Sequence, residues 1–177
     1  KENIVYDQEL LSTEAEKNDF VFGTIYLTGL EKDNIVGQKS DGTKESGYYA
    51  IRKATFVKTF EGLLGAKLPD VEKYPSNNSN KEYVVQNTYL YGYFWLGWPD
   101  LGTILKHNDF TNNGDGTYTL IVDVLSGYEA SKATELADPK LDSGYDQFVT
   151  AQLKLELAKL NDDLYSIKSI QFIKLEK

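Results

Sequence analysis

Residues 103–125 read TILKHNDFTNNGDGTYTLIVDVL, and this stretch decides the fold class of the chain. Two β-prone runs, Thr103 to Phe110 and Thr117 to Leu125, flank the turn sequence Asn112-Asn113-Gly114-Asp115-Gly116. Asn-Gly and Asp-Gly pairs supply the positive φ angles that tight hairpin turns require. The stretch therefore predicts an antiparallel hairpin that turns at Asn112–Gly116.

The β pattern extends from this hairpin in both directions. Between Val149 and Leu157, apolar residues alternate with polar ones, as in a strand with one buried face. The turn residues Asn161-Asp162-Asp163 follow, which predicts a second hairpin over residues 147–175. Toward the N-terminus, the β pattern begins at Tyr83.

The residues before Tyr83 favour helices and loops. Apolar residues recur at helical spacing before Gly65 and Pro69, at Ala50, Ala54, Val57, Phe60 and Leu64. Residues 19–27 fit a helix or a strand, and we favour the helix. Asp33 to Gly47 is predicted to be a loop, and Tyr74 to Lys81 a polar connector.

This order of elements predicts an α+β fold. N-terminal helices would pack on a curved antiparallel β-sheet, a meander of four to five strands. The length of 177 residues favours a single domain that spans residues 1–177. Because the chain opens with Lys1 rather than Met, we expect a trimmed mature chain or a fragment.

The amino-acid composition of the chain limits which classes of partner and cofactor we expect. Nineteen Lys and Arg against 27 Asp and Glu give a net charge of −8, which disfavours nucleic acids and anionic membrane surfaces. No apolar run approaches the roughly 20 residues of a transmembrane helix. The absence of cysteine excludes disulfides and thiolate metal sites. The sequence has no Gly-rich phosphate loop, nucleophile elbow or His-Glu-x-x-His site, so we expect no cofactor.

Two short sequence segments in the C-terminal half resemble segments of known families. The run Leu164–Phe172 resembles the closing strand of cystatin-like and nuclear-transport-factor-two-like domains. The run Asn113–Leu120 resembles the mid-sheet hairpin of small Gram-positive envelope lipoproteins. The resemblance covers residues 100–177 approximately. It implies a curved sheet around a helix with a pocket between them, in an exported, envelope-associated protein.

An aromatic row is the first candidate site. Four aromatic residues alternate with Leu90, Gly92 and Phe94, so that one face of a strand would carry Tyr89, Tyr91, Tyr93 and Trp95. Aromatic faces bind sugars and other ligands that have an apolar side. The row is equally what a strand buried beneath helices contains. We expect at least two of its members to line a concavity or a subunit contact.

His107 and Asp123 form the second candidate site. They stand on the two arms of the first hairpin, and a register with an even sum of opposed residue numbers would place them on one face. A carboxylate that orients an imidazole makes a general base. The alternative is that both are polar residues on a solvated sheet face.

A third pattern concerns calcium. Asp109 to Thr117 places oxygen atoms at alternate positions with a glycine at the sixth, which partly matches a calcium loop. The twelfth position is Leu120 rather than an acid, so we interpret the segment as a turn without metal.

Two classes of function remain open. The first is a non-catalytic binding or interaction domain of an exported, envelope-associated bacterial protein, whose ligand is a small molecule, a glycan or a protein. The alternative is a small-molecule pocket enzyme of the cone-shaped α+β type that uses His107 with Asp123. An oligomer interface at the aromatic row is a third, structural possibility.

Overall fold

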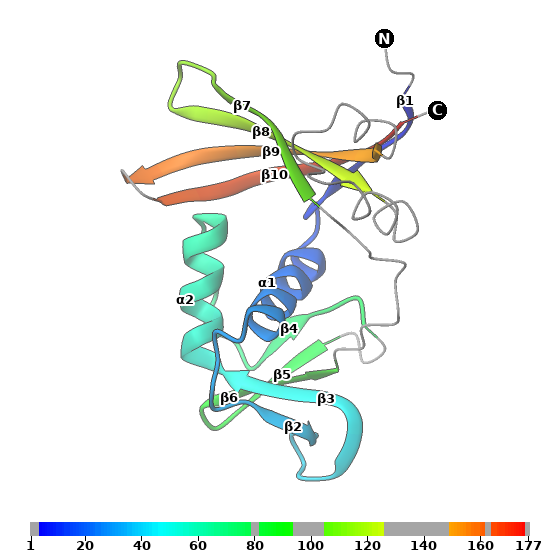
Figure 1. Cartoon of the computed structure of the whole chain (residues 1–177). Helices are drawn as coiled ribbons and strands as arrows, with labels where there is room; N and C mark the ends of the chain where they lie inside the picture. The colour runs from blue at the N-terminus through cyan, green and yellow to red at the C-terminus, as the bar shows by residue number, and fades with distance from the viewer. Residues whose placement is uncertain (1–3, 79–81, 94–104, 126–148, 162–163, 176–177) are drawn as a thin grey trace. The chain divides into compact units, whose positions relative to one another are not determined.

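The computed structural model describes residues 4–78, 82–93, 105–125, 149–161 and 164–175. The chain divides into two compact units, unit 1 (Lys1–Leu10 and Gly97–Lys177) and unit 2 (Leu11–Leu96). Each unit has its own five-stranded sheet (Figure 1). The predicted mixture of helices and antiparallel strands is confirmed. The single domain, and the packing of the helices on the C-terminal meander, stay predictions.

Unit 1 contains one antiparallel sheet with the strand order β1-β10-β9-β8-β7. The bounds of its strands are β1 Ile4–Leu10, β7 Leu105–Asn112, β8 Thr117–Leu125, β9 Val149–Asn161 and β10 Leu164–Leu175. Both predicted hairpins are confirmed, β7–β8 and β9–β10. The strand β1 was not predicted, because its partner β10 lies at the other end of the chain.

The alternation in β9 sorts its side chains between the two faces of the sheet. Val149, Ala151 and Leu157 are buried, and Glu156 is exposed. On the apolar face, Phe110 and Tyr118 stack with ring centroids 5.3 Å apart. Tyr165 meets Tyr118 edge to face at 5.1 Å. These three rings form an aromatic cluster near the two hairpin turns, in which Phe110 remains exposed.

Unit 2 combines two helices with a sheet of strand order β2-β3-β6-β5-β4. The bounds of its elements are α1 Glu14–Thr28, β2 Ile35–Gln38, β3 Lys44–Arg52, α2 Lys53–Leu64, β4 Lys73–Pro75, β5 Glu82–Gln86 and β6 Tyr89–Tyr93. No helix in the described part of the chain is long and apolar enough to cross a membrane.

Helix α1 confirms the helical interpretation of residues 19–27. It begins at a capping box, in which Thr13 Oγ1 accepts from Glu16 N (3.2 Å) and Glu16 Oε2 accepts from Thr13 N (2.9 Å). The two bonds satisfy backbone N–H groups that the first turn leaves without partners. Gly29, in the left-handed region at φ 64°, ends the helix.

The connector predicted at Tyr74–Lys81 begins only after Pro75, because Tyr74 and Pro75 belong to β4 and Tyr74 is buried. Two further predictions for unit 2 are wrong. Residues 33–47 do not form a single loop, because β2 and the start of β3 lie within them and pair with each other. The helix predicted from Ala50 begins only at Lys53, because residues 48–52 pair with β6. The β-prone run Tyr48-Tyr49-Ala50-Ile51 explains both errors, since sheet pairing outweighs helical spacing there.

The core of unit 2 lies between the helices and one face of its sheet. Tyr83 of β5 is fully buried and stacks on Phe22 of α1, with ring centroids 4.5 Å apart. Phe56 of α2 contacts Tyr74 at 5.7 Å and Tyr83 at 6.4 Å between centroids. The helices therefore cover the sheet face to which Tyr83 points.

Candidate functional site

Four tyrosines share the other face of the unit 2 sheet, and we call the surface made by Tyr48, Tyr89, Tyr91 and Tyr93 the tyrosine face. The β3–β6 register pairs Tyr48 with Tyr93, Ala50 with Tyr91 and Arg52 with Tyr89. Directly paired residues project to the same side of a sheet. Tyr48 is 5% exposed, whereas the three tyrosines of β6 are half-buried. Trp95 lies outside the described residues.

The residues between these tyrosines show why the row faces away from the helices. Leu90 is fully buried, and Gly92 is buried against the Tyr83 ring. A Cβ atom on Gly92 would come within 2.0 Å of Tyr83 Cδ1. The alternation of β6 thus gives its Leu90–Gly92 side to the core and its tyrosines to the opposite side.

The tyrosine face is organised by ring contacts and by two cations. Tyr89 and Tyr91 lie 6.3 Å apart between centroids, and Tyr48 and Tyr93 meet edge to face at 5.3 Å. Lys39 Nζ lies 5.0 Å from the centroid of the Tyr48 ring. Arg52 Cζ lies 5.2 Å from the centroid of the Tyr89 ring. The negative ring faces attract these cations.

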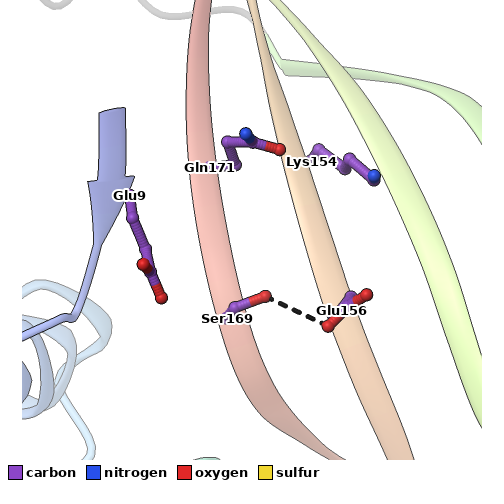
Figure 2. Close-up of a pocket in the computed structure, with 5 residues that line it drawn as sticks. All are labelled: Glu9, Lys154, Glu156, Ser169 and Gln171. Atoms are coloured by element: carbon purple, nitrogen blue, oxygen red, sulfur yellow. Dashed lines mark hydrogen bonds between the residues drawn. The ribbon is translucent and has the colours of Figure 1, made fainter. Parts of the chain in front are cut away.

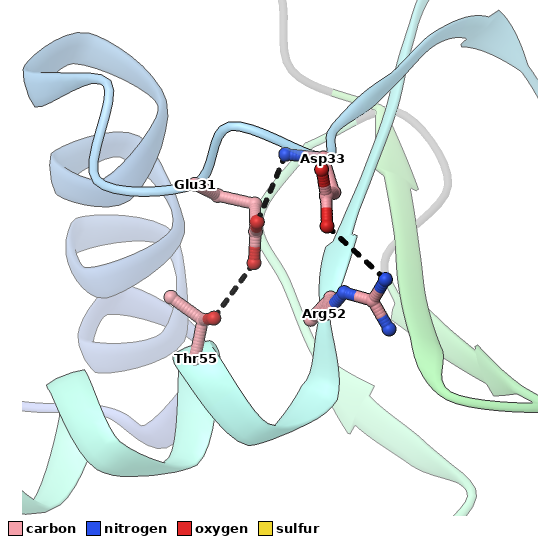
Figure 3. Close-up of polar contacts among 4 residues, drawn as sticks. All are labelled: Glu31, Asp33, Arg52 and Thr55. Carbon is pink, nitrogen blue, oxygen red and sulfur yellow. Dashed lines mark hydrogen bonds and ion pairs between the residues drawn. The ribbon is translucent and has the colours of Figure 1, made fainter.

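A polar network holds Arg52 in this position (Figure 3). Its Nη2 donates to Asp33 Oδ2 at 3.1 Å, and this hydrogen bond raises the Arg52 pKa most. The neighbouring Glu31 accepts from the Thr55 hydroxyl at 2.7 Å and from Asp33 N at 3.0 Å. These bonds, the Thr55 bond most, lower the Glu31 pKa. The segment after α1 is thereby fixed to β3 and α2.

A cavity of about 240 Å³ opens at one end of the tyrosine face. We call it the turn cavity, and its lining residues are Lys39, Ser40, Asp41, Tyr48, Glu82, Val84 and Tyr91. The β2–β3 turn supplies the first three of them. In this turn Lys39 N donates to Thr43 O (2.9 Å) and Gly42 N to Lys39 O (3.0 Å). The hydrogen-bonded turn holds Ser40 and Asp41 beside the aromatic rings.

Charged groups of both signs border the turn cavity. Lys39 forms an ion pair with Glu45, and their hydrogen bond raises the Lys39 pKa. Asp41 Oδ1 accepts from Thr43 N at 2.8 Å, which lowers the Asp41 pKa. Glu82 Oε1 accepts from Lys73 Nζ at 2.7 Å. Lys39 and Asp41 therefore remain charged across neutral pH.

Three polar groups of the turn cavity have hydrogen-bonding capacity that the described residues do not use. They are the hydroxyls of Ser40 and Tyr91 and the Oε2 atom of Glu82. The ring of Tyr91 is half-buried, lines the same cavity and contacts the ring of Tyr89. The cavity thus offers a ring surface together with donors and acceptors, which is a typical composition of ligand sites.

A wider groove of about 700 Å³ follows the outer side of α2. Its lining residues are Arg52, Lys53, Ala54, Val57, Lys58, Glu61, Asn87 and Thr88. Arg52 and Lys53 are engaged in ion pairs with Asp33 and Asp70. The groove is apolar at Ala54 and Val57, but two of its three cations already have partners.

Unit 1 carries a polar cavity of about 210 Å³ (Figure 2). Its lining comes from neighbouring strands, with Glu9 on β1, Ser169 and Gln171 on β10, and Lys154 and Glu156 on β9. Register places Glu9, Gln171 and Lys154 in one row across the sheet. The Ser169 hydroxyl donates to Glu156 Oε2 at 3.4 Å. All five side chains are polar, and none of these lining residues has an aromatic ring.

The β7–β8 register bears on the His107 and Asp123 dyad. Lys106 pairs with Asp123 and His107 with Val122, so the opposed residue numbers sum to an odd value. At these positions the register does not have the even sum of opposed residue numbers that would place His107 and Asp123 on one face. Asp123 is 4% exposed and accepts from Gln152 Nε2 at 3.0 Å. The side chain of His107 lies outside the described part of the chain.

The oxygen atoms of residues 109–117 accept hydrogen bonds within the turn. Asp115 Oδ1 accepts from Thr117 N at 2.9 Å and from its hydroxyl at 2.6 Å. Asn112 Oδ1 accepts from Gly114 N at 2.9 Å. Among the described residues, no group of three or more His, Cys, Asp or Glu could hold a metal ion.

Sequence reasoning missed one polar cluster in unit 2. Asp19 of α1 accepts from the Tyr83 hydroxyl (2.8 Å), the Ser76 hydroxyl (2.5 Å) and Asn77 N (2.8 Å). The hydroxyl of Tyr83 also accepts from Asn78 Nδ2 at 3.2 Å. The cluster ties the connector after β4 to α1. No local pattern could reveal it, because Asp19 is separated from the other members by more than fifty residues.

Comparisons of the chain with protein-family models, curated proteins and solved structures found no match. The resemblance to cystatin-like and nuclear-transport-factor-two-like domains therefore stays a prediction.

Proposed function

We propose that the chain is a non-catalytic binding domain that holds a ligand against the tyrosine face of unit 2. The observation that carries this proposal is the position of Tyr91. Its half-buried ring stands on the sheet face opposite the helices and lines a cavity with the unused polar groups of Ser40 and Glu82. A ring beside polar groups of both kinds binds and orients a ligand without reacting with it.

Pre-organisation supports the same function. Arg52 is held over Tyr89 by Asp33, and Lys39 is held over Tyr48 while paired with Glu45. Side chains that are fixed before binding lose less conformational entropy when a ligand arrives. The cations over Tyr48 and Tyr89 are therefore held in place before a ligand binds to the tyrosine face.

The proposal includes an exported protein associated with the envelope of a Gram-positive bacterium, with a cystatin-like arrangement of the fold. This part of the proposal is supported by the resemblance of the segment Asn113–Leu120 to the mid-sheet hairpin of small Gram-positive envelope lipoproteins. The gene sequence upstream of Lys1 tests this part. A lipobox there supports it, and a continuous cytoplasmic domain there contradicts it.

Ligand screening by NMR tests the proposed site. Amide spectra of the whole chain are recorded with sugars, aromatic fragments and tetramethylammonium. We expect at least one class to shift the resonances of Tyr48, Tyr89 and Tyr91 in a saturable way, and Tyr91→Leu to abolish the effect. The matched control is Tyr165→Leu, which removes a half-buried tyrosine from unit 1.

Two outcomes would contradict the proposal. Binding that maps only to Val57 or Glu9 would move the function to the groove or to the polar cavity. Self-association that increases with concentration and disappears in Tyr91→Leu would make the tyrosine face a subunit contact.

A further inference from the structure

We infer that the turn cavity binds one ring of an uncharged pyranose sugar, stacked on Tyr91. This inference rests on the proposed function and specifies the class of ligand. It follows from three properties of the cavity, namely its aromatic surface, its mixture of donors and acceptors, and its balance of charge.

The aromatic surface comes from Tyr91, because the rings of Tyr48 and Tyr89 each carry a cation of the chain itself. Tyr91 pairs across the sheet with Ala50, which is fully buried and does not line the cavity. On its other side it pairs with Val84, which also lines the cavity. A pyranose has one face of C–H groups, which matches an aromatic ring next to a short aliphatic side chain.

The polar groups around this surface suit hydroxyls. A sugar hydroxyl both donates and accepts, so it can donate to Glu82 Oε2 and accept from the Ser40 hydroxyl. Lys39 Nζ and the Tyr91 hydroxyl supply further donors at the same cavity. Sugar hydroxyls can form the same kinds of hydrogen bond with these groups as water does, so their burial costs little affinity.

The charges select against ions. Asp41, Glu82 and Lys39 all line the cavity, and Glu45 pairs with Lys39 while Lys73 pairs with Glu82. An anion would meet the carboxylates, and a cation would meet the ammonium groups. A neutral ligand with alternating donors and acceptors uses both signs without leaving a charge unpaired.

NMR titration of the whole chain with neutral methyl pyranosides and their disaccharides tests the inference, with the gluco, galacto, manno and N-acetylglucosamine forms as probes. We expect saturable shifts at residues 39–41, 82, 84 and 91, with a Kd on the order of 1 mM for a single ring. Disaccharides should bind at least as tightly, because their first ring can occupy the cavity in the same way as a single ring does.

Three variants separate the parts of the site. Tyr91→Leu removes the ring and should weaken binding about tenfold or more, whereas Tyr91→Phe keeps the ring and should weaken it only about threefold. Glu82→Gln keeps the shape of the side chain, and its weakening should fall between these two. Wild-type affinity in Tyr165→Leu is the control for a general effect of losing a tyrosine.

The failure of the sugar class differs from the failure of the proposed function. If no neutral sugar shifts these residues while tetramethylammonium or an aromatic fragment does, the tyrosine face is a binding site and the sugar inference is wrong. If Tyr91→Leu binds sugars as the wild type does, stacking on Tyr91 is wrong. If no probe of any class shifts these residues, both proposals fail.

Discussion

At the scale of single residues, the contact between Gly92 and Tyr83 decides which way β6 faces. The Tyr83 ring occupies the space that a side chain at position 92 would need. The same ring contacts both helices, through Phe22 and Phe56. Loss of the glycine would therefore disturb the core and the tyrosine face together.

Gly92→Ala should lower the free energy of unfolding by about 1–3 kcal/mol, because the new Cβ atom overpacks the core against Tyr83. Gly62→Ala is the matched control. Gly62 lies within α2 and has no neighbouring atom within 4 Å of an added Cβ. Alanine there should stabilise the protein by about 0.5–1 kcal/mol. Chemical denaturation measures both, and equal effects of the two substitutions would refute the overpacking.

Tyr83 makes stability depend on pH in the alkaline range. Burial, and then the negative charge of Asp19, raise the pKa of Tyr83 well above its ordinary value of 10.0. The folded state holds the Tyr83 hydroxyl proton more tightly than the unfolded state does. The stabilisation of the folded state that results is therefore fully present below about pH 10 and is lost as the pH rises further. Tyr83→Phe should flatten the fall in melting temperature above that pH. An unchanged slope would show that Tyr83 is not responsible.

At the scale of elements, the capping box fixes where α1 begins. Thr13→Ala should cost about 1 kcal/mol of unfolding free energy, because Glu16 N loses its acceptor. Thr13→Ser keeps the hydroxyl and should remain close to the wild type. Thermal unfolding of the two variants is the measurement, and equal melting temperatures would mean that the box contributes nothing.

Local sequence signals predicted the elements whose partners lie nearby in the chain. The hairpins β7–β8 and β9–β10 were found because a turn sequence and two alternating runs specify them. The strand β1 was missed because its partner β10 lies at the other end of the chain, where no local sequence signal can indicate the pairing. β3 was missed because Tyr48–Ile51 pairs with β6, a partner about forty residues away.

The candidate site was predictable to a similar extent. Period-two spacing placed Tyr89, Tyr91 and Tyr93 together on one face, and the burial of Leu90 supports that assignment. The contribution of Lys39, Ser40 and Asp41 was not predicted, because it depends on the β2–β3 hairpin that the sequence did not reveal. Tyr48 was missed for the same reason, since β3 brings it beside Tyr93.

At the scale of the whole molecule, charge is divided unequally between the units. Unit 1 contains sixteen Asp and Glu against nine Lys and Arg, whereas unit 2 contains eleven against ten. Almost all of the net charge of −8 therefore belongs to unit 1. The tyrosine face lies in the nearly neutral unit, whose own net charge neither attracts nor repels charged ligands strongly at long range.

The division into units leads to a prediction about folding. Unit 2 is one continuous segment with its own buried residues, among them Phe22, Ile51, Phe56, Tyr83 and Leu90. Unit 1 needs both ends of the chain, because β1 pairs with β10. A fragment of residues 11–96 should therefore fold alone, with near-ultraviolet circular dichroism and a cooperative thermal transition. A fragment of residues 97–177 lacks β1 and should be less stable than the same segment with residues 1–10 supplied as a peptide. If the 11–96 fragment melts without a cooperative transition, the buried residues of unit 2 do not suffice for folding, and the two units must be treated as one cooperative structure.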